Sequence, residues 1–143
     1  MKPRVKLYLC DEEHEGIFGD GRWRLLRAIA DEGSIRAAAR RLGRGYRKAW
    51  GDIERAEQAL GRPLVERSRG GAEGGTAALT EFGRRLLEGW ERCRDAVGAC
   101  MEAEFERHLR SVIEGRGERF GPDDAGREEE KRTDKPERQD HES

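Results

Sequence analysis

The sequence predicts a mainly α-helical fold with a small β-sheet, in which a helix-turn-helix is followed by a β-hairpin and a long helix. Three observations lead to this prediction. Apolar residues recur at helical spacing in four segments, glycines end the first three of them, and a short alternating segment precedes them all. The 143 residues can form one compact domain of ordinary size with an extension.

The first predicted element is a short strand, because Val5, Leu7 and Leu9 alternate with Lys6, Tyr8 and Cys10. A turn-rich stretch over residues 11–21 follows it. The next apolar residues, from Trp23 to Ala30, group on one helical face until Gly33 ends the run. We therefore expect a strand with one face inward and then a first helix.

The predicted helix-turn-helix covers about residues 34–60. Ser34 occupies an N-cap position, and the apolar spacing from Ile35 to Leu42 predicts a short second helix. Only residues 43–45 separate it from the third helix, and so tight a glycine-containing turn is typical of a helix-turn-helix. The apolar positions of the third helix are Tyr46, Ala49, Trp50, Ile53, Ala56 and Leu60. We expect Trp50 to pack inward, and Tyr46 to bury its ring while its hydroxyl is a candidate phosphate contact.

A hairpin is predicted over about residues 64–80. Leu64 and Val65 can form a brief strand, a glycine-rich loop follows, and residues 77–79 can return as its partner. The glycines at 70, 71, 74 and 75 suit the tip of such a hairpin. Arg67, Ser68 and Arg69 are the hairpin residues expected to contact a sugar-phosphate strand.

A long helix is predicted after Thr80, which is a candidate N-cap, and it extends for up to about thirty residues. Gly89 and Gly98 would each cost about 1 kcal/mol relative to Ala, and so allow a bend or break. We interpret Cys93 and Cys100 as buried small apolar residues. The apolar stripe exceeds what one small domain can cover, which favours a homodimer. The expected dimer-interface residues are Leu86, Trp90, Cys93, Val97, Met101 and Phe105.

Composition limits the function classes. Charged residues make up 41% of the chain and hydrophobic residues 34%, and the polar residues 116–143 are typical of a disordered, charged tail. This divides the chain into residues 1–80, 81–115 and 116–143. No apolar run reaches membrane-spanning length, and the N-terminus turns acidic too early for a secretory signal, so we expect a cytoplasmic protein. We find no catalytic constellation and expect no enzyme, no metal site and no cofactor.

The outer face of the third helix is cationic. Residues 22–69 contain thirteen Lys or Arg against six Asp or Glu. Long cationic side chains at the N-terminal end of a helix can donate to guanine edges and phosphates in the major groove of DNA. The candidate DNA-binding residues are Ser34, Arg36, Arg44, Gly45, Tyr46, Arg47, Lys48, Arg55, Arg67, Ser68 and Arg69.

The motifs of residues 17–90 resemble the N-terminal domain of the ModE family of molybdate-responsive transcription regulators. The resemblance rests on GSI followed by small residues, Tyr-x-x-Ala-Trp at 46–50, LVER at 64–67, the glycine-rich loop, and LTxFG at 79–83. The same order is more distantly similar to the winged-helix domain of LysR-type regulators.

The resemblance implies a winged helix-turn-helix that binds double-stranded operator DNA as a homodimer, with the recognition helix beginning near Arg44 and the hairpin as the wing. It also implies that the N-terminal strand joins the small sheet and that outlying helices dimerise. Nothing after Gly115 resembles the oxyanion-binding domains of the family. We therefore expect no effector domain, and molybdate or tungstate sensing does not carry over.

Two alternatives belong to other classes. A nucleotide-binding loop would need Lys and then Ser or Thr after Gly75, where Thr76 and Ala77 stand, so this hypothesis is disfavoured. The other alternative is a protein-interaction module, whose long helix and acidic tail bind a separate sensor or effector protein.

Overall fold

The computed structural model of the chain describes residues 1–69 and 75–115. The hairpin tip predicted at residues 70–74 and the tail predicted at residues 116–143 lie outside these described residues. The chain divides into a unit of residues 1–105 and a unit of residues 106–143. Within the described ranges, no helix is both long and apolar enough to cross a membrane.

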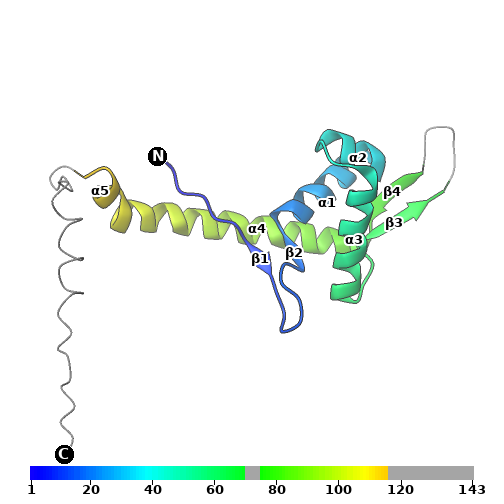
Figure 1. Cartoon of the computed structure of the whole chain (residues 1–143), viewed down its shortest axis with the longest axis horizontal. Coiled ribbons are helices and arrows are strands. Elements are labelled where there is room, and N and C mark those ends of the chain that lie inside the picture. The colour runs from blue at the N-terminus through cyan, green and yellow to red at the C-terminus, as the bar shows by residue number, and fades with distance from the viewer. Residues whose placement is uncertain (70–74, 116–143) are drawn as a thin grey trace, which may run out of the picture. The chain divides into compact units, whose positions relative to one another are not determined.

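The first unit confirms the mainly helical fold with small β-sheets (Figure 1). Its helices are α1 (Asp20–Glu32), α2 (Ile35–Arg41), α3 (Tyr46–Leu60) and α4 (Glu81–Glu104). Its strands are β1 (Tyr8–Leu9), β2 (Phe18–Gly19), β3 (Val65–Ser68) and β4 (Thr76–Leu79). Each predicted helix is present, and α2, α3 and the β3–β4 hairpin lie together at one end of α4 (Figure 1).

The N-terminal strand is shorter than predicted and has a different partner. β1 pairs antiparallel with β2, with Tyr8 opposite Gly19 and Leu9 opposite Phe18, whereas β3 pairs only with β4. The expectation that the N-terminal strand joins the hairpin sheet is therefore wrong. The reason is that Phe18 is fully buried in the core and fixes β2 at the start of α1, and the short turn before it brings β1 back alongside, where the Ile17 N–H donates to the Leu9 carbonyl at 2.8 Å.

The helix-turn-helix forms through the capping residues that the sequence indicated. The Ser34 side chain accepts a hydrogen bond from the Ala37 N–H at 2.9 Å and so caps α2. The Arg44 N–H donates to the Ala39 carbonyl at 2.8 Å, which closes the C-terminal end of α2 before α3 begins. The turn between the two helices includes Gly43, whose φ of 62° is a left-handed conformation that favours glycine.

The core lies where α1, α2, α3 and the hairpin meet. Its largest fully buried side chains are Phe18, Leu25, Leu26, Ile29 and Leu64. The Trp90 ring from α4 packs edge-on against Phe18, with 5.1 Å between the ring centroids. This contact attaches the first half of α4 to the domain.

Backbone hydrogen bonds fix the hairpin against the helices. The Ala77 N–H donates to the Gly33 carbonyl at 2.8 Å, and the Thr80 N–H donates to the Leu64 carbonyl at 3.0 Å. The Glu57 carboxylate accepts from the Leu64 N–H at 2.9 Å and from the neighbouring N–H of β3 at 3.2 Å. The hairpin therefore has a defined position beside the helix-turn-helix.

The long helix starts at its predicted cap, where the Thr80 hydroxyl accepts from the Gly83 N–H at 2.9 Å. It continues through Gly89 and Gly98 without a break, so the glycines do not interrupt it. Its buried residues all lie at or before Trp90. Cys93 and Cys100 are exposed, and our interpretation of them as buried was wrong, because the core reaches α4 only up to Trp90.

The second unit begins within the helical segment that follows α4. A π-helical stretch, η1 (Phe105–Leu109), is followed by the short helix α5 (Arg110–Ile113). Arg110 forms ion pairs with Glu106 and Glu114 on either side of it. The irregularity in the helical segment thus occurs after α4, away from both glycines.

Candidate nucleic-acid interface

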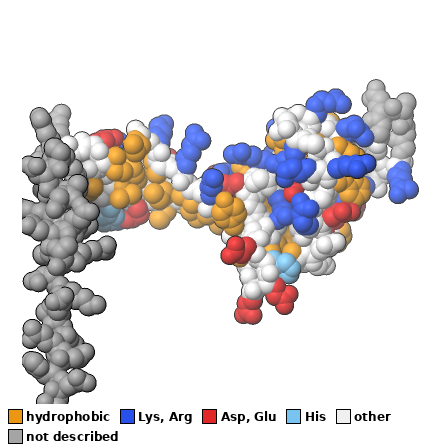
Figure 2. All heavy atoms as spheres, viewed as in Figure 1, with side chains coloured by type: hydrophobic (Ala, Val, Ile, Leu, Met, Phe, Trp, Pro, Cys, Tyr) orange, Lys and Arg blue, Asp and Glu red, His pale blue; other side chains and the backbone are white. Residues whose placement is uncertain are grey.

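The predicted recognition helix presents its cations to solvent at its N-terminal end. Arg47 and Lys48 are exposed in the first turn of α3, and Arg36 is exposed on α2. Ser68 and Arg69 are exposed at the end of β3. Lys and Arg side chains gather over the end of the molecule that carries α2 and α3 (Figure 2). This surface has the charge that a DNA backbone requires.

Ser34 has a structural role in this arrangement. Its hydroxyl accepts the Ala37 N–H and its side chain is half-buried, so its acceptor capacity serves the start of α2. Gly45 is exposed and precedes the first residue of α3, where no side chain caps the helix. The first N–H groups of α3 therefore receive no side-chain cap from Gly45, unlike those of α2, which Ser34 caps.

Tyr46 and Trp50 lie at the margin of the core: Trp50 packs against the core as predicted, whereas the expectation that Tyr46 buries its ring was wrong. Tyr46 is 38% exposed, and Trp50 is half-buried with its indole N–H donating to the Tyr46 hydroxyl at 2.8 Å. The inward positions of α3 are occupied by Ala49, Ile53 and Ala56. Tyr46 and Trp50 are one turn apart beside that buried stripe, which explains why their rings flank the core.

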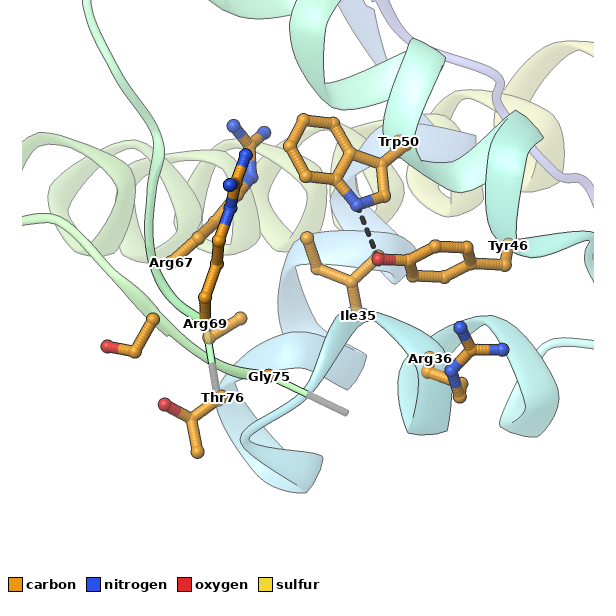
Figure 3. Close-up of a pocket in the computed structure, with 10 residues that line it drawn as sticks. Ile35, Arg36, Tyr46, Trp50, Arg67, Arg69, Gly75 and Thr76 are labelled. Atoms are coloured by element: carbon orange, nitrogen blue, oxygen red, sulfur yellow. Dashed lines mark hydrogen bonds between the residues drawn. The ribbon is translucent and has the colours of Figure 1, made fainter. Parts of the chain in front are cut away.

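Two guanidinium groups stack on these two aromatic rings. Arg36 lies over the Tyr46 ring at 4.4 Å, and Arg67 lies over the Trp50 ring at 3.7 Å from the ring centroid. Figure 3 shows the side chains around an open pocket of about 400 Å³ between the helix-turn-helix and the hairpin. The pocket combines cationic and aromatic groups, which can contact a phosphate and the sugar beside it.

Arg67 is less available to a ligand than the sequence suggested. Its side chain is 26% exposed, and its guanidinium lies 3.6 Å from the Glu57 carboxylate. Its Nε and one terminal nitrogen are buried without a hydrogen-bond acceptor among the described residues. Arg69, which is exposed, is therefore the freer of the two hairpin arginines.

Asp52 is a part of the surface that we did not predict. Its carboxylate lies 2.7 Å from Arg55, 3.4 Å from Lys48 and 3.5 Å from Arg44. All three cations are candidate DNA contacts: Arg44 lies in the turn before α3, and Lys48 and Arg55 lie two helical turns apart on α3. The i, i+4 spacing from Lys48 and the i, i+3 spacing to Arg55 are visible in the sequence, but the pairing with Arg44 depends on the turn.

The predicted dimer-interface residues separate into two groups. Leu86, Val97 and Met101 are half-buried and Cys93 is exposed, so each has surface left for a partner. Trp90 is only 6% exposed and packs against Phe18, so its assignment to an interface was wrong. Phe105 is 4% exposed, and it too has almost no free surface.

Comparison with known proteins matches this part of the chain to one family. Residues 21–84 match the model described as "Bacterial regulatory helix-turn-helix protein, lysR family". This range runs from α1 to the first turn of α4.

Individual relatives share the same region. The molybdenum transport protein ModE of Azotobacter vinelandii is 36% identical over 73% of this chain and 36% of its own length. The DNA-binding transcriptional dual regulator ModE of Escherichia coli K12 is 42% identical over 59% of this chain and 33% of its own length. The molybdenum-pterin-binding protein MopA of Rhodobacter capsulatus is 43% identical over 50% of this chain and 27% of its own length. The chain thus matches between 27% and 36% of the length of these relatives.

Proposed function

We propose that this chain is a sequence-specific transcription regulator that binds operator DNA, because residues 21–84 match the lysR-family helix-turn-helix model. The observation that carries the proposal is the exposed cationic first turn of α3 beside the cationic hairpin. Arg47 and Lys48 are the residues proposed to reach base edges in the major groove. Because its target is DNA, we expect the protein to act in the cytoplasm.

The remaining cations are proposed to contact the DNA backbone. Arg36 and Arg69 are exposed and line the pocket between the helix-turn-helix and the hairpin, beside α3. The Tyr46 hydroxyl, which accepts the Trp50 indole N–H, keeps its own proton to donate to a phosphate oxygen.

A homodimer is proposed to form through the part of α4 that follows Trp90. Val97 and Met101 are half-buried and Cys93 is exposed on this part of the helix, beyond the domain core. Two copies related by two-fold symmetry would bind inverted half-sites about one helical turn of DNA apart or a multiple of it. Sedimentation equilibrium should give a mass of twice 16.3 kDa. If the protein is instead a monomer and captures a different protein from a cell extract, that result would favour an effector protein bound to this helix.

Selection of binding sites from random DNA, followed by titration at several salt concentrations, tests the function. Arg47→Ala or Lys48→Ala should weaken binding to the selected site by about 1 to 3 kcal/mol and relax the preference at one base pair. Arg36→Ala or Arg69→Ala should weaken binding to all sequences and flatten the salt dependence by about one unit.

Arg24→Ala is the matched control, because Arg24 is an exposed arginine on α1 that belongs neither to the proposed DNA-binding residues nor to the proposed dimer segment. It should leave affinity and site preference unchanged. If no sequence is enriched, or if binding neither depends on salt nor responds to the α3 variants, then the proposed function is wrong.

A further inference from the structure

One charged residue of α3 is buried beneath the exposed cations of this helix. Asp52 is 8% exposed and is the only buried charged residue in the part of the chain that the structure describes. It lies one turn after Lys48, in the middle of the helix proposed to read DNA. A carboxylate in such a position loses hydration and needs strong partners, because an unpaired buried charge is costly.

Those partners are three of the candidate DNA-binding cations. One carboxylate oxygen, Oδ1, accepts a hydrogen bond from Arg55 at 2.7 Å. The other, Oδ2, lies 3.4 Å from the Lys48 ammonium and 3.5 Å from Arg44. The side chains of Lys48 and Arg55 are 67% and 60% exposed, so they reach solvent, whereas Arg44 is 20% exposed and lies inside.

The same carboxylate also connects α3 to α1. Arg44 donates to the Gly21 carbonyl at 3.5 Å as well as to Asp52. Burial lowers the pKa of Arg22 on α1, and the negative charge of Asp52 opposes that effect. Asp52 is thus surrounded by positive groups from α1, the turn and α3.

Ion pairs of this kind contribute little net stability, because desolvation offsets most of the attraction. We infer that Asp52 is a positioning residue for DNA recognition: it holds Arg44, Lys48 and Arg55 in one arrangement, which favours the operator over other DNA. The inference rests on the proposed function of α3. It assigns no direct base contact to Asp52.

The charge of Asp52 also acts on binding to DNA of any sequence. Sequence-independent binding grows with the number of cations free to neutralise phosphates. Because Asp52 pairs with Lys48 and Arg55, it weakens their attraction to DNA of any sequence. The same pairing orients these two side chains for the operator. Both effects increase the ratio of operator affinity to background affinity.

Asp52→Asn tests the inference, because it keeps the size of the side chain and removes the charge. We expect the ratio of operator to background affinity to fall about tenfold, with tighter background binding and a salt slope steeper by up to about one unit. Asp52→Glu keeps the charge but moves the carboxylate by one methylene group, and the ratio should fall to an intermediate value.

Glu54→Gln is the matched control, since Glu54 is an exposed carboxylate on the same helix and its loss changes the net charge equally. It should strengthen background binding without a tenfold loss of the ratio. Thermal melting of each variant shows whether it is folded, and the Glu variant decides the question if the Asn variant is unfolded.

Different outcomes separate this inference from the proposed function. If the wild-type chain enriches no sequence, the proposed function itself fails. If the wild-type chain selects an operator and folded Asp52→Asn keeps the full affinity ratio, or if Glu54→Gln lowers it as much, then Asp52 does not position the cations. An unchanged ratio in Asp52→Glu overturns the inference in the same way.

Discussion

Gly83 lies where the first turn of the long helix passes close to the backbone just before β3. A methyl group at this position would place its carbon 2.2 Å from the Leu64 carbonyl oxygen and 3.0 Å from the Leu64 carbonyl carbon. The same carbonyl accepts the Thr80 N–H at 3.0 Å. Both neighbouring atoms belong to the backbone, so they can move away only if the start of β3 or the first turn of α4 shifts.

The size of the effect follows from two opposing contributions. Replacing glycine by alanine inside an exposed helix stabilises a protein by about 1 kcal/mol. Overpacking in a well-packed region costs about 1 to 3 kcal/mol, and a contact at 2.2 Å is far inside the favourable separation of about 3.5 to 4.0 Å. We therefore expect Gly83→Ala to lower the free energy of unfolding by about 2 kcal/mol.

Gly89→Ala provides the control in the same helix, because nothing lies within 4 Å of a methyl group there. It should raise the free energy of unfolding by up to about 1 kcal/mol. Urea denaturation followed by circular dichroism measures both variants, and thermal melting should show a shift of about 4 to 8 °C per kcal/mol. A Gly83→Ala protein as stable as Gly89→Ala would refute the close approach of α4 to Leu64.

Two further predictions concern side-chain hydrogen bonds. Glu91→Gln should lower the free energy of unfolding by about 1 kcal/mol at neutral pH, because the Glu91 carboxylate accepts N–H groups from Arg27 and Trp23 across α1 and α4. The Arg27 hydrogen bond holds the pKa of Glu91 below its usual value. Urea denaturation should therefore show the full difference in stability between wild type and variant above about pH 4.3, and a smaller difference as the pH falls through the folded-state pKa. A stability difference that does not change with pH would contradict this prediction. Ser34→Ala should cost about 1 kcal/mol through loss of the α2 cap on the Ala37 N–H, and an unchanged melting temperature would exclude that role.

The comparison of sequence and structure shows which kinds of interaction can be predicted. Helices were predictable because their signals are local: Ser34 and Thr80 cap α2 and α4, and glycines follow α1 and α3 at Gly33 and Gly61. The hairpin was predictable for the same reason, since its strands are close in sequence and its turn is rich in glycine.

The errors concern which segment pairs with a strand or covers an apolar helix face. The partner of β1 was assigned wrongly because pairing depends on where Phe18 enters the core. Trp90 was assigned to a dimer interface because helical periodicity identifies an apolar face without identifying what covers it. In the structure a ring from another part of the same chain covers Trp90.

The sequence by itself determined the helix-turn-helix and the cationic first turn of α3, because these depend on capping, apolar spacing and the identity of neighbouring residues. Only the tertiary structure decided which cations are free. Arg67 stacks on Trp50, and Arg44 reaches Asp52 across the turn, whereas Arg47 remains exposed. The physical reason is that the partner of a long charged side chain is chosen by distances of a few ångströms between elements, which the order of residues does not specify.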